Sequence, residues 1–476
     1  MKKAFLKSRW SLLATIALLG CILGLPTRSH AQVCSPPPTA IAGNNTVYEI
    51  CSSTATAIPS SAYVDVQAFD PATTDDICTK IKNALSASST AAGTVLDARG
   101  VLPGSGTTQS CGTNPFSGIT KTSIVLLPAG TITLSAAWAI PSTTQVIGQG
   151  PGVTILQASS TSFTDAYVFS ATAGNSNPAM IHMGVPNTTS TFTRNLAFGI
   201  KLLHLTLDGQ GQKIGTTYID GIDNTNAEEQ SYVEDVAINN ILGNGLYLGI
   251  DPGGSGDGAA DHSGPYNDIT FQEPVSTALS TTVCVNVVAG VQPRGLHGIT
   301  CAANTTPSAA ILLDGSNITV DNVRIDGFQD GILVGEHPSS THGPAQAIVL
   351  ENILGTTSVG NTNNLIHIAN PTSPTPVSVT VLGATSAVNN TLQDDLTSTT
   401  LTFSSDPHVG FYVVGHPIGS TGYTRFTTSP RFPAWLTGST SALISGSCAN
   451  GSLFSSTTGT GGTLYTCVSN SWSKIQ

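Results

Sequence analysis

Two stretches of the chain repeat one pattern of apolar and polar positions. Each begins with a short alternating run rich in β-branched residues, bends at residues that tolerate positive φ, and continues with a second short run that opens with Gly. The first stretch covers residues 233–248 and the second covers residues 320–334. A strand pair of this kind cannot bury its apolar face alone, so the repeat predicts coils that stack into a solenoid.

Similar apolar runs predict strands along most of the chain. They lie at residues 94–100, 123–134, 144–150, 154–156, 203–207, 268–271, 297–300 and 347–350. The pattern continues less clearly through residues 376–435, with final strands expected at 410–414 and 423–426. The unequal intervals indicate that loops of different length interrupt a common coil, and such loops carry binding groups on one side of a rigid stack.

The start of the folded region is expected to close the first coil. Tyr63–Phe69 alternates like a strand. Thr73–Asp76 has the form of a capping box with Asp in place of the usual Glu, and apolar residues continue at helical spacing from Ile77 to Leu85. We therefore expect a helix here that covers the open end of the solenoid.

Residues 94–156 resemble the first coils of the pectate-lyase-like family of right-handed parallel β-helices. The common pattern of that family is a strand, a Pro-Ala-Gly-Thr-Tyr-like turn, a second strand, and a Gly-x-Gly before a Thr-rich strand. This chain has Pro-Ala-Gly-Thr at 128–131 with Ile132 in place of Tyr, and Gly-Gln-Gly at 148–150. The resemblance implies an all-β, right-handed parallel β-helix but no particular reaction, since the superfamily includes lyases, hydrolases, epimerases, phage tailspikes and adhesins.

Composition agrees with an ordered β-rich chain. Only 9% of the 476 residues are charged, 39% are hydrophobic and 49 are Gly, which is the opposite of the profile of unfolded chains. We expect four segments: a signal peptide at 1–31, a linker and clipped loop at 32–60, the β-helix at 61–435, and a small two-cysteine module at 436–476. For that module, capping is favoured over sugar binding through Trp472, because a lone Trp beside a disulfide usually packs on it.

The first 31 residues indicate export. Basic residues precede an apolar run at 12–25, and Ser29 and Ala31 supply the small residues that a signal peptidase needs. The run is too short to span a membrane, and no later segment qualifies as a transmembrane span. Removing residues 1–31 leaves 12 basic and 28 acidic residues, a formal charge of −16. This charge disfavours nucleic acid as a partner and mildly disfavours a strongly acidic polysaccharide.

The exported chain keeps eight cysteines, and an even number there indicates disulfides. Proximity in sequence favours pairing of neighbours, namely Cys34 with Cys51, Cys78 with Cys111, Cys284 with Cys301, and Cys448 with Cys467. Other pairings stay open. Zinc binding is disfavoured, because no two cysteines have the close spacing of zinc ligands.

A Gly-rich loop at residues 251–262 is the candidate metal site. It carries Asp251, Asp257 and Asp261, and Asp268 follows it. Spaced carboxylates on a flexible backbone suit Ca²⁺, although the spacing is not that of an EF-hand. A solvated loop with turn-forming Asp is the favoured alternative. The sequence establishes no cofactor, and a calcium ion at this loop is the one candidate.

Acidic residues recur where stacked coils would bring them together. The candidate catalytic residues are Asp208, Asp223, Glu228 and Asp235. Two carboxylates roughly 5–10 Å apart would serve a glycosidase as acid and as base or nucleophile. Asp220 belongs to the same group of acids. Asp208, Asp326 and Asp330 stand directly before Gly, where Asp commonly forms only the corner, so a structural role is favoured for these three.

Arg294, His297 and Arg324 are the candidate substrate-binding residues. A β-eliminating lyase needs a base for the proton α to a uronate carboxylate and a cation that neutralises this carboxylate. Arg324 beside Asp321 fits such a role, but a surface ion pair worth little is the favoured interpretation.

The catalytic motifs of the pectin-degrading hydrolases are not intact in this chain. Those enzymes carry, in order, Asn-Thr-Asp, Asp-Asp, Gly-His-Gly and Arg-Ile-Lys, whereas this chain has broken and reordered counterparts at 223–225, 295–298 and 324–330. The sequence therefore predicts an exported β-helix whose flank meets an extracellular polysaccharide, as a lyase or a glycoside hydrolase. The alternative is a non-catalytic surface adhesin or spike that uses the same flank. The sequence leaves the oligomeric state open.

Overall fold

The computed structural model describes residues 62–72, 74–101, 108–167, 178–185, 196–249, 262–273, 281–304, 307–336, 347–356, 364–369, 378–386, 390–394, 400–402, 435–438, 453–456, 463–468 and 471–475. Two compact units divide the chain, residues 1–60 and 61–476, and every described residue belongs to the second. In this part of the chain, no helix is long and apolar enough to cross a membrane.

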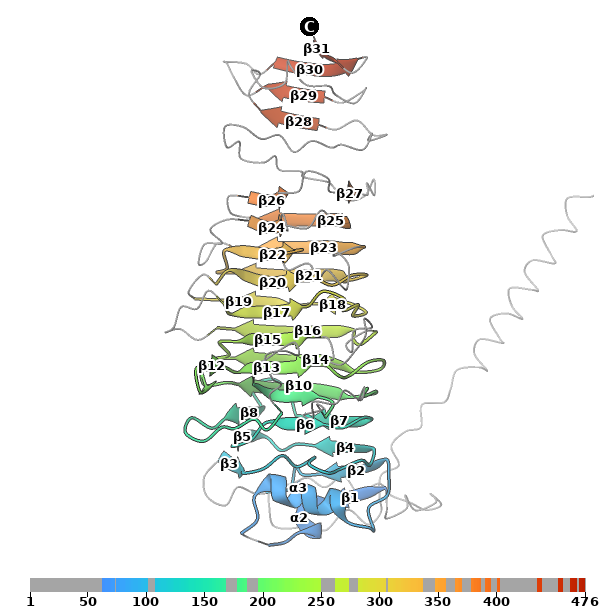
Figure 1. Cartoon of the computed structure of the whole chain (residues 1–476), viewed down its shortest axis with the longest axis vertical. Helices are drawn as coiled ribbons and strands as arrows, with labels where there is room; N and C mark the ends of the chain where they lie inside the picture. Colours follow the sequence, from blue (N-terminus) through green and yellow to red (C-terminus); the bar gives the residue numbers. More distant parts are fainter. Residues whose placement is uncertain are drawn as a thin grey trace, which may run out of the picture. The chain divides into compact units, whose positions relative to one another are not determined.

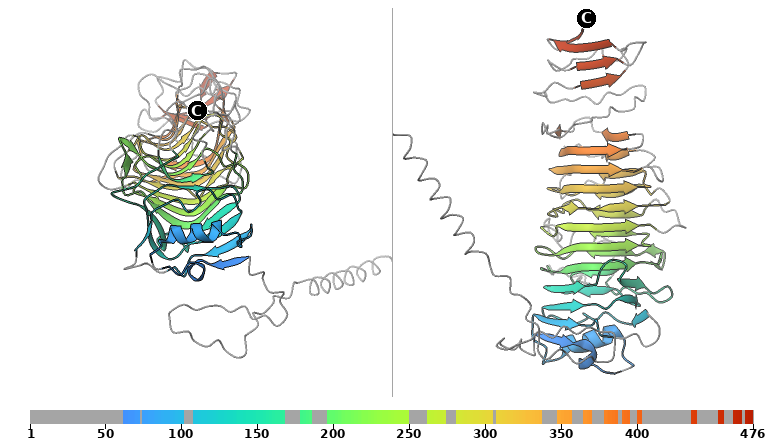
Figure 2. Two further views of the ribbon diagram at one scale, coloured as in Figure 1. Left: turned by 60° about the horizontal axis from the view of Figure 1, so that its bottom comes forward. Right: turned by 180° about the vertical axis from the view of Figure 1, so that it is seen from behind.

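Two long parallel sheets form a right-handed parallel β-helix (Figures 1 and 2). Sheet 1 follows the path β1 (Tyr63–Asp65), β2 (Thr94–Asp97), β4 (Ser123–Leu126), β7 (Thr144–Ile147), β10 (Lys201–Asp208), β14 (Tyr232–Asn239), β16 (Tyr266–Gln272), β18 (Leu296–His297), β21 (Thr319–Asp326), β23 (Ile348–Gly355), β25 (Ser378–Ser386) and β27 (Thr400–Thr402). Beside this path lie β3 (Thr108–Cys111), β5 (Gly130–Leu134), β8 (Thr154–Ala158) and β19 (Thr300–Ala302).

Sheet 2 stacks one strand from each coil in register with the next. Its strands are β6 (Trp138–Ile140), β9 (Ala179–Met183), β13 (Asp220–Asn224), β15 (Asn244–Leu248), β17 (Val283–Val287), β20 (Ala309–Leu313), β22 (Asp330–Val334), β24 (Asn364–Ile368) and β26 (Asn390–Asp394). A short antiparallel hairpin, β11 (Lys213–Ile214) with β12 (Thr217–Tyr218), interrupts the chain between β10 and β13. The predicted solenoid of stacked strand pairs is thus confirmed.

The core consists of aliphatic columns that run through the coils. Leu205 on β10 is aligned with Val236 on β14, which is aligned with Ile269 on β16, and all three are fully buried. Such columns make one contiguous core between the sheets. The Gly that opens the second run of each repeat also has a packing reason, because a Cβ on Gly245 would lie 2.6 Å from the Cys284 carbonyl oxygen of the next coil.

A row of left-handed residues bends the strands of sheet 1 at one level. The row contains His204, Asp235, Asp268, Gly298, Asn322 and Asn352, which the strand register aligns and whose φ angles lie between +51° and +66°. Gly, Asn and Asp visit this conformation most readily, so the row selects these residue types. At Gly298 the bend splits the strand predicted at 297–300 into β18 and β19.

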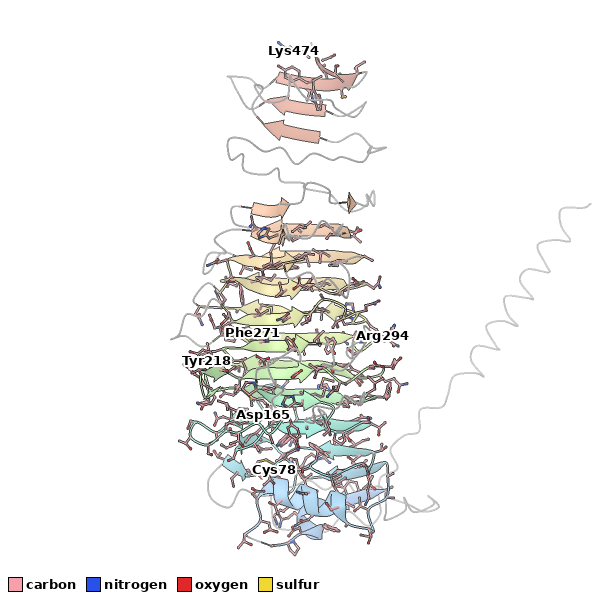
Figure 3. All side chains as sticks on the ribbon, viewed as in Figure 1. Cys78, Asp165, Tyr218, Phe271, Arg294 and Lys474 are labelled. Atoms are coloured by element: carbon pink, nitrogen blue, oxygen red, sulfur yellow. A yellow bond between two sulfur atoms is a disulfide. The ribbon has the colours of Figure 1, made fainter. Side chains whose placement is uncertain are left out.

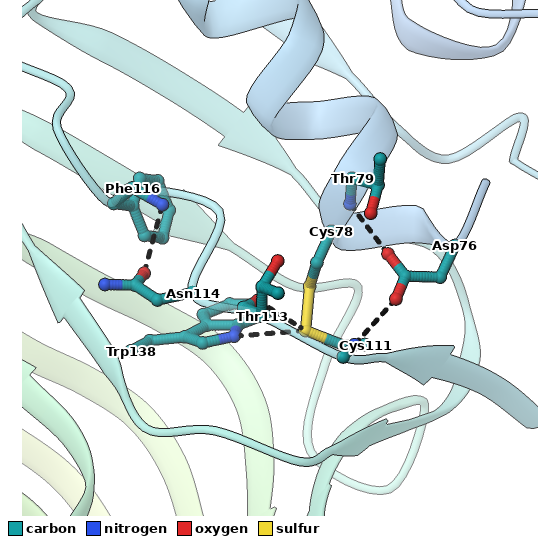
Figure 4. The surroundings of a disulfide bond; sticks show 9 residues. Asp76, Cys78, Thr79, Cys111, Thr113, Asn114, Phe116 and Trp138 are labelled. Carbon is teal, nitrogen blue, oxygen red and sulfur yellow. Dashed lines mark hydrogen bonds between the residues drawn. A yellow bond between two sulfur atoms is a disulfide. The ribbon is translucent and has the colours of Figure 1, made fainter. Parts of the chain in front are cut away.

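The predicted capping helix is present as α3 (Ile77–Ser86), which packs against β2 and β3. Asp76 caps its N-terminus by accepting from the Thr79 N–H at 2.7 Å and also accepts from the Gly112 N–H at 2.6 Å (Figure 4). The strand predicted over 63–69 is too long. Asp65 accepts from the N–H groups of two following residues and starts the short helix α2 (Val66–Phe69) after β1.

Disulfides join neighbouring cysteines in the described residues. Cys78 of α3 is bonded to Cys111 of β3, where the Trp138 indole N–H also points at the Cys111 sulfur (Figure 4). Cys284 is bonded to Cys301. Both pairings agree with the sequence prediction. Cys467 is disulfide-bonded, whereas Cys448, Cys34 and Cys51 lie outside the described residues.

A separate four-stranded sheet forms the small C-terminal module. It comprises β28 (Trp435–Gly438), β29 (Leu453–Ser456), β30 (Thr463–Val468) and β31 (Ser471–Lys474). Strands β29, β30 and β31 are antiparallel, and Trp472 on β31 is aligned with Cys467 on β30. The strands predicted at 410–414 and 423–426 lie outside the described residues.

Candidate functional site

The outer face of sheet 2 carries two rows of side chains, with one residue from each coil. The first row is His182, Asp223, Tyr247, Asn286, Leu312, Leu333 and His367. The second row, three residues earlier in each strand, is Asp220, Asn244, Val283, Ala309, Asp330 and Asn364. Residues between the rows belong to the core, whereas four apolar members of the rows form a cluster of their own. Both rows therefore point away from the core.

Three side chains at the β9–β13 end of these rows form a buried acid–imidazole–acid array. The His182 Nε2 lies 2.8 Å from Asp165 Oδ2, and the His182 Nδ1 lies 3.4 Å from Asp223 Oδ2. Each of the three side chains is at most 2% exposed. We call this set, Asp165, His182 and Asp223, the imidazole array; Asp165 is labelled in Figure 3.

Local backbone structure fixes Asp165 in the imidazole array. Its carboxylate accepts from the N–H groups of Tyr167 at 2.7 Å and Ala179 at 2.9 Å, in addition to His182. The Tyr167 ring meets the His182 ring edge-on, with 5.7 Å between centroids. These contacts orient the imidazole so that its other nitrogen faces Asp223.

The two carboxylates decide the charge of His182. Burial alone lowers the pKa of an imidazole, but Asp165 and then Asp223 outweigh it and raise the pKa of His182 to about 10. Burial alone also raises the pKa of Asp165, yet its hydrogen bonds and the imidazolium hold this pKa below the usual value. At neutral pH the array therefore contains an ionised Asp165 and a protonated His182.

Asp223 differs from Asp165 in having no hydrogen-bond donor in the described residues, although the His182 imidazolium lies 3.4 Å from its Oδ2. It is 1% exposed, and neither of its carboxylate oxygens has a hydrogen-bond partner in the described part of the chain. Buried carboxylates are normally hydrogen-bonded, because a buried charge without donors is costly. Asp223 is therefore the carboxyl group in this region that could still accept hydrogen bonds on both of its oxygens.

Tyr247 of the next coil lies beside Asp223 in sheet 2. It is aligned with Asp223 in the sheet and is 8% exposed, so it is the member of this group that reaches the surface. Burial, followed by the charges of Asp223 and Asp220, raises the pKa of its phenol. Tyr247 is thus a neutral hydroxyl beside two carboxylates.

Amide side chains extend the polar site along the rows. Asp220 accepts from the backbone N–H of Asn244 at 2.6 Å and from its side-chain amide at 3.0 Å, and Asn286 donates to the Asn244 oxygen at 3.1 Å. Farther along, Asp330 accepts from the Asn364 amide at 2.9 Å and lies 2.7 Å from His367 Nδ1. The apolar members of the rows separate these two polar groups.

The imidazole array predicts a specific pH dependence of stability. Because folding raises the pKa of His182 from 6.5 to about 10, its contribution is fully present below about pH 6.5 and is lost as the pH rises through 10. The pKa of Asp165 is lowered by folding, so its contribution to stability is present at neutral pH and is lost as the pH falls into the acid range. We expect the melting temperature of the wild type to fall more steeply between pH 6.5 and 10 than that of His182→Gln, measured by calorimetry. Equal slopes would contradict a protonated buried His182.

The structure separates the four predicted catalytic acids. Asp208 ends β10 and accepts from the side-chain amides of Gln157 at 3.0 Å and Asn240 at 2.8 Å, a corner role. Asp235 belongs to the left-handed row and lies 2.9 Å from His204 Nδ1, with both side chains more than 40% exposed. Glu228 is buried after β13.

Of these four acids, only Asp223 is on the outer face of sheet 2. The corner role expected for Asp330 is wrong, because Asp330 opens strand β22 in the second row.

The predicted substrate-binding residues do not meet Asp223 either. Arg294 and Arg324 are exposed, and Arg324 lies on β21 of sheet 1. The His297 imidazole pairs with Asp321 across β18 and β21, also in sheet 1. Figure 3 labels Arg294 at the edge of the stack. These residues thus form no common site with the imidazole array.

The predicted calcium site is only partly described. Asp251, Asp257 and Asp261 lie outside the described residues, and Asp268 is an exposed member of the left-handed row. Its left-handed backbone is a sufficient reason for Asp at this position. Within the described ranges, no three or more His, Cys, Asp or Glu side chains are grouped to hold a metal ion.

Sequence reasoning missed Asp165, His182 and Tyr247 as functional candidates. His182 is the single polar residue in the apolar run Ala179–Met183, and that exception is the one signal the sequence offered. Asp165 is 17 residues from His182, in the loop before β9, and the sequence holds no signal that the two side chains meet.

No family model matches the chain, and no curated protein matches it. Among solved structures, it is similar to the A-module of mannuronan C-5 epimerase AlgE4 from Azotobacter vinelandii, with 14% identity, a TM-score of 0.29, and coverage of 71% of this chain and 100% of that one. It is also similar to a polygalacturonase from Erwinia carotovora, with 12% identity, a TM-score of 0.31, and coverage of 65% of this chain and 100% of that one. A third similar structure is ORF18 of Geobacillus virus E2, with 11% identity, a TM-score of 0.29, and coverage of 72% of this chain and 62% of that one. The parallel strand register by itself shows that the chain is a parallel β-helix.

Proposed function

We propose that this chain is an exported glycoside hydrolase that acts on a polysaccharide at the outer face of sheet 2. The observation that carries the proposal is Asp223, a carboxylate that is 1% exposed and has no hydrogen-bond donor on either oxygen in the described structure. Such a group is costly to keep unless it serves binding or catalysis. Tyr247, its neighbour on the next coil, is 8% exposed.

The protonation states favour hydrolysis over elimination. Elimination needs a base that removes a carbon-bound proton, and His182 and Tyr247 are the two side chains at this place that could serve. Both are protonated at neutral pH. The two carboxylates raise the pKa of His182 to about 10, and burial, followed by the charges of Asp223 and Asp220, raises the pKa of Tyr247. Asp223 remains as the carboxylate that accepts a proton from the attacking water. As the bond from the anomeric carbon to the leaving sugar oxygen breaks, that oxygen takes its proton from the Tyr247 hydroxyl.

The length of the two rows suits a polymer. Strand positions on neighbouring coils lie about 4.8 Å apart, so the five coil steps from Asp223 to His367 span about 24 Å. Polar side chains at both ends, Asp220 with Asn244 and Asp330 with Asn364, would hold separate sugar units. A single small molecule would need only one of these groups.

Export is part of the proposal and rests on the sequence of residues 1–31. Two disulfides within the described β-helix support it, since disulfides persist in oxidising compartments.

The test is a turnover screen of the chain from residue 32 onward on neutral and acidic polysaccharides. New reducing ends and ultraviolet absorbance are read in parallel, because elimination creates an unsaturated sugar and hydrolysis does not. We expect reducing ends without absorbance. Both signals together would contradict hydrolysis, and polymer binding without any turnover would favour the adhesin instead.

A further inference from the structure

We propose that His182, oriented by Asp165, is a positioning residue for the hydrolysis, and that its imidazolium ion keeps the buried Asp223 ionised. The proposal rests on the proposed function and gives His182 a role at the same site. It is carried by the geometry of the imidazole array, in which one ring nitrogen faces each of the two carboxylates.

A buried carboxyl group can serve as a base only while it is ionised. Asp223 is 1% exposed, and burial by itself favours the neutral, protonated form of a carboxyl group. Backbone N–H groups offset this effect at Asp165, but neither oxygen of Asp223 accepts a hydrogen bond from the described residues. Asp223 therefore needs a nearby positive charge if it is to accept a proton from water.

The His182 imidazolium supplies that charge without occupying the carboxylate. Its Nδ1 lies 3.4 Å from Asp223 Oδ2, and the attraction between two buried charges at this distance is strong, because little water screens it. The contact nevertheless lacks the geometry of a hydrogen bond, and both carboxylate oxygens are without a hydrogen-bond partner in the described residues. They can therefore still accept hydrogen bonds from the attacking water.

Asp165 sets both the orientation and the charge of the His182 ring. Its carboxylate lies 2.8 Å from Nε2 and is itself held by the N–H groups of Tyr167 and Ala179. This contact turns Nδ1 toward Asp223. Burial lowers the pKa of His182, but Asp165 and then Asp223 outweigh it and raise this pKa to about 10. The ring therefore stays protonated at the neutral and acid pH values at which Asp223 has to be ionised.

The elements around His182 leave the proton transfers to other groups. Their titratable side chains, apart from the array itself, are Tyr167 before β9, Asp220 on β13 and Tyr247 on β15. Strand β6, on the other side of β9, has no titratable residue. During hydrolysis Asp223 takes a proton from water and Tyr247 gives one to the leaving oxygen. His182 keeps its proton throughout and acts through its charge.

The pH dependence of kcat/KM separates this role from a structural one. His182→Gln removes the positive charge beside Asp223, so the carboxyl group becomes harder to ionise. On the polymer that the turnover screen identifies, we expect the acid limb of the kcat/KM profile to move to higher pH by about 1–3 units. The rate should recover toward the wild-type value as the pH rises.

His204→Gln is the matched control. His204 also pairs with a carboxylate, at 2.9 Å from Asp235, but this pair lies on sheet 1 and both side chains are more than 40% exposed. Gln is compatible with the left-handed backbone at this position, since Gln210 and Gln230 adopt similar φ angles. We expect this variant to keep the acid limb of the wild type.

A neutron crystal structure of the wild-type protein at pH 7 tests the charges without any variant, so the test does not depend on the folding of His182→Gln. We expect deuterium on both ring nitrogens of His182 and none on the Asp223 carboxylate. A deuterium on Asp223, or on only one nitrogen of His182, would overturn the proposal.

Failure of this proposal and failure of the proposed function give different results. A fall in kcat/KM of His182→Gln by the same factor at every pH, with the acid limb unmoved, would make His182 a purely structural residue and leave the hydrolase standing. Absence of turnover on every polymer by the wild type would overturn the proposed function and the role of His182 with it.

Discussion

Replacing Asp223 with Asn lowers kcat on the polysaccharide substrate by about 10²–10⁴-fold while leaving the melting temperature unchanged or raised. The amide has the shape of the carboxylate but cannot accept a proton from water or attack a sugar carbon. At the same time it removes a buried charge that has no hydrogen-bond donor in the described structure, which is a destabilising feature of the native protein. The two effects go in opposite directions, as expected of a residue kept for function.

Rates and calorimetric melting temperatures of the same preparations check this prediction. Glu351→Gln is the matched control, since it makes the same carboxylate-to-amide change on sheet 1. Full turnover in Asp223→Asn would remove Asp223 from catalysis. A clear drop in its melting temperature would show that Asp223 is mainly a structural partner of His182.

Replacing Asp165 with Ala destabilises the protein by about 3–5 kcal/mol, because it leaves the buried imidazolium of His182 without its nearest counter-charge. It also leaves the N–H groups of Tyr167 and Ala179 without their acceptor. The loss is read as a shift in the urea midpoint of unfolding at pH 7.

The double variant Asp165→Ala/His182→Gln tests the cause. Removing the imidazole together with its partner should cost less than the sum of the two single changes, because no buried cation remains. Strict additivity, or a cost of Asp165→Ala below about 1 kcal/mol, would show that the two side chains do not form a charged pair.

Sheet 1 was predictable from the sequence, and most of sheet 2 was not. Strands of sheet 1 such as β14 and β21 alternate between core and surface, which gives the period-2 signal. Strands β9, β13 and β20 are buried at every position, so Ala309–Leu313 reads as a short apolar run without alternation. The two sheet 2 strands that were predicted, β15 and β22, belong to the visible repeat.

The candidate site depended on information that a sequence does not hold. Asp235 and Asp268 are indistinguishable from catalytic or metal-binding acids until the backbone shows their left-handed conformation. Asp223 was among the predicted acids, but its significance comes from burial without donors. Its partner Asp165 comes from another coil, and stacking alone brings the two to the same imidazole.

The most direct test of a functional site on sheet 2 is a crystal structure of Asp223→Asn with an oligosaccharide of the polymer that the screen identifies. We expect a sugar ring in contact with residue 223 and Tyr247, and further units along the two rows toward Asp330 and His367. An oligosaccharide bound instead to sheet 1, or to the C-terminal strands β28–β31, would contradict it.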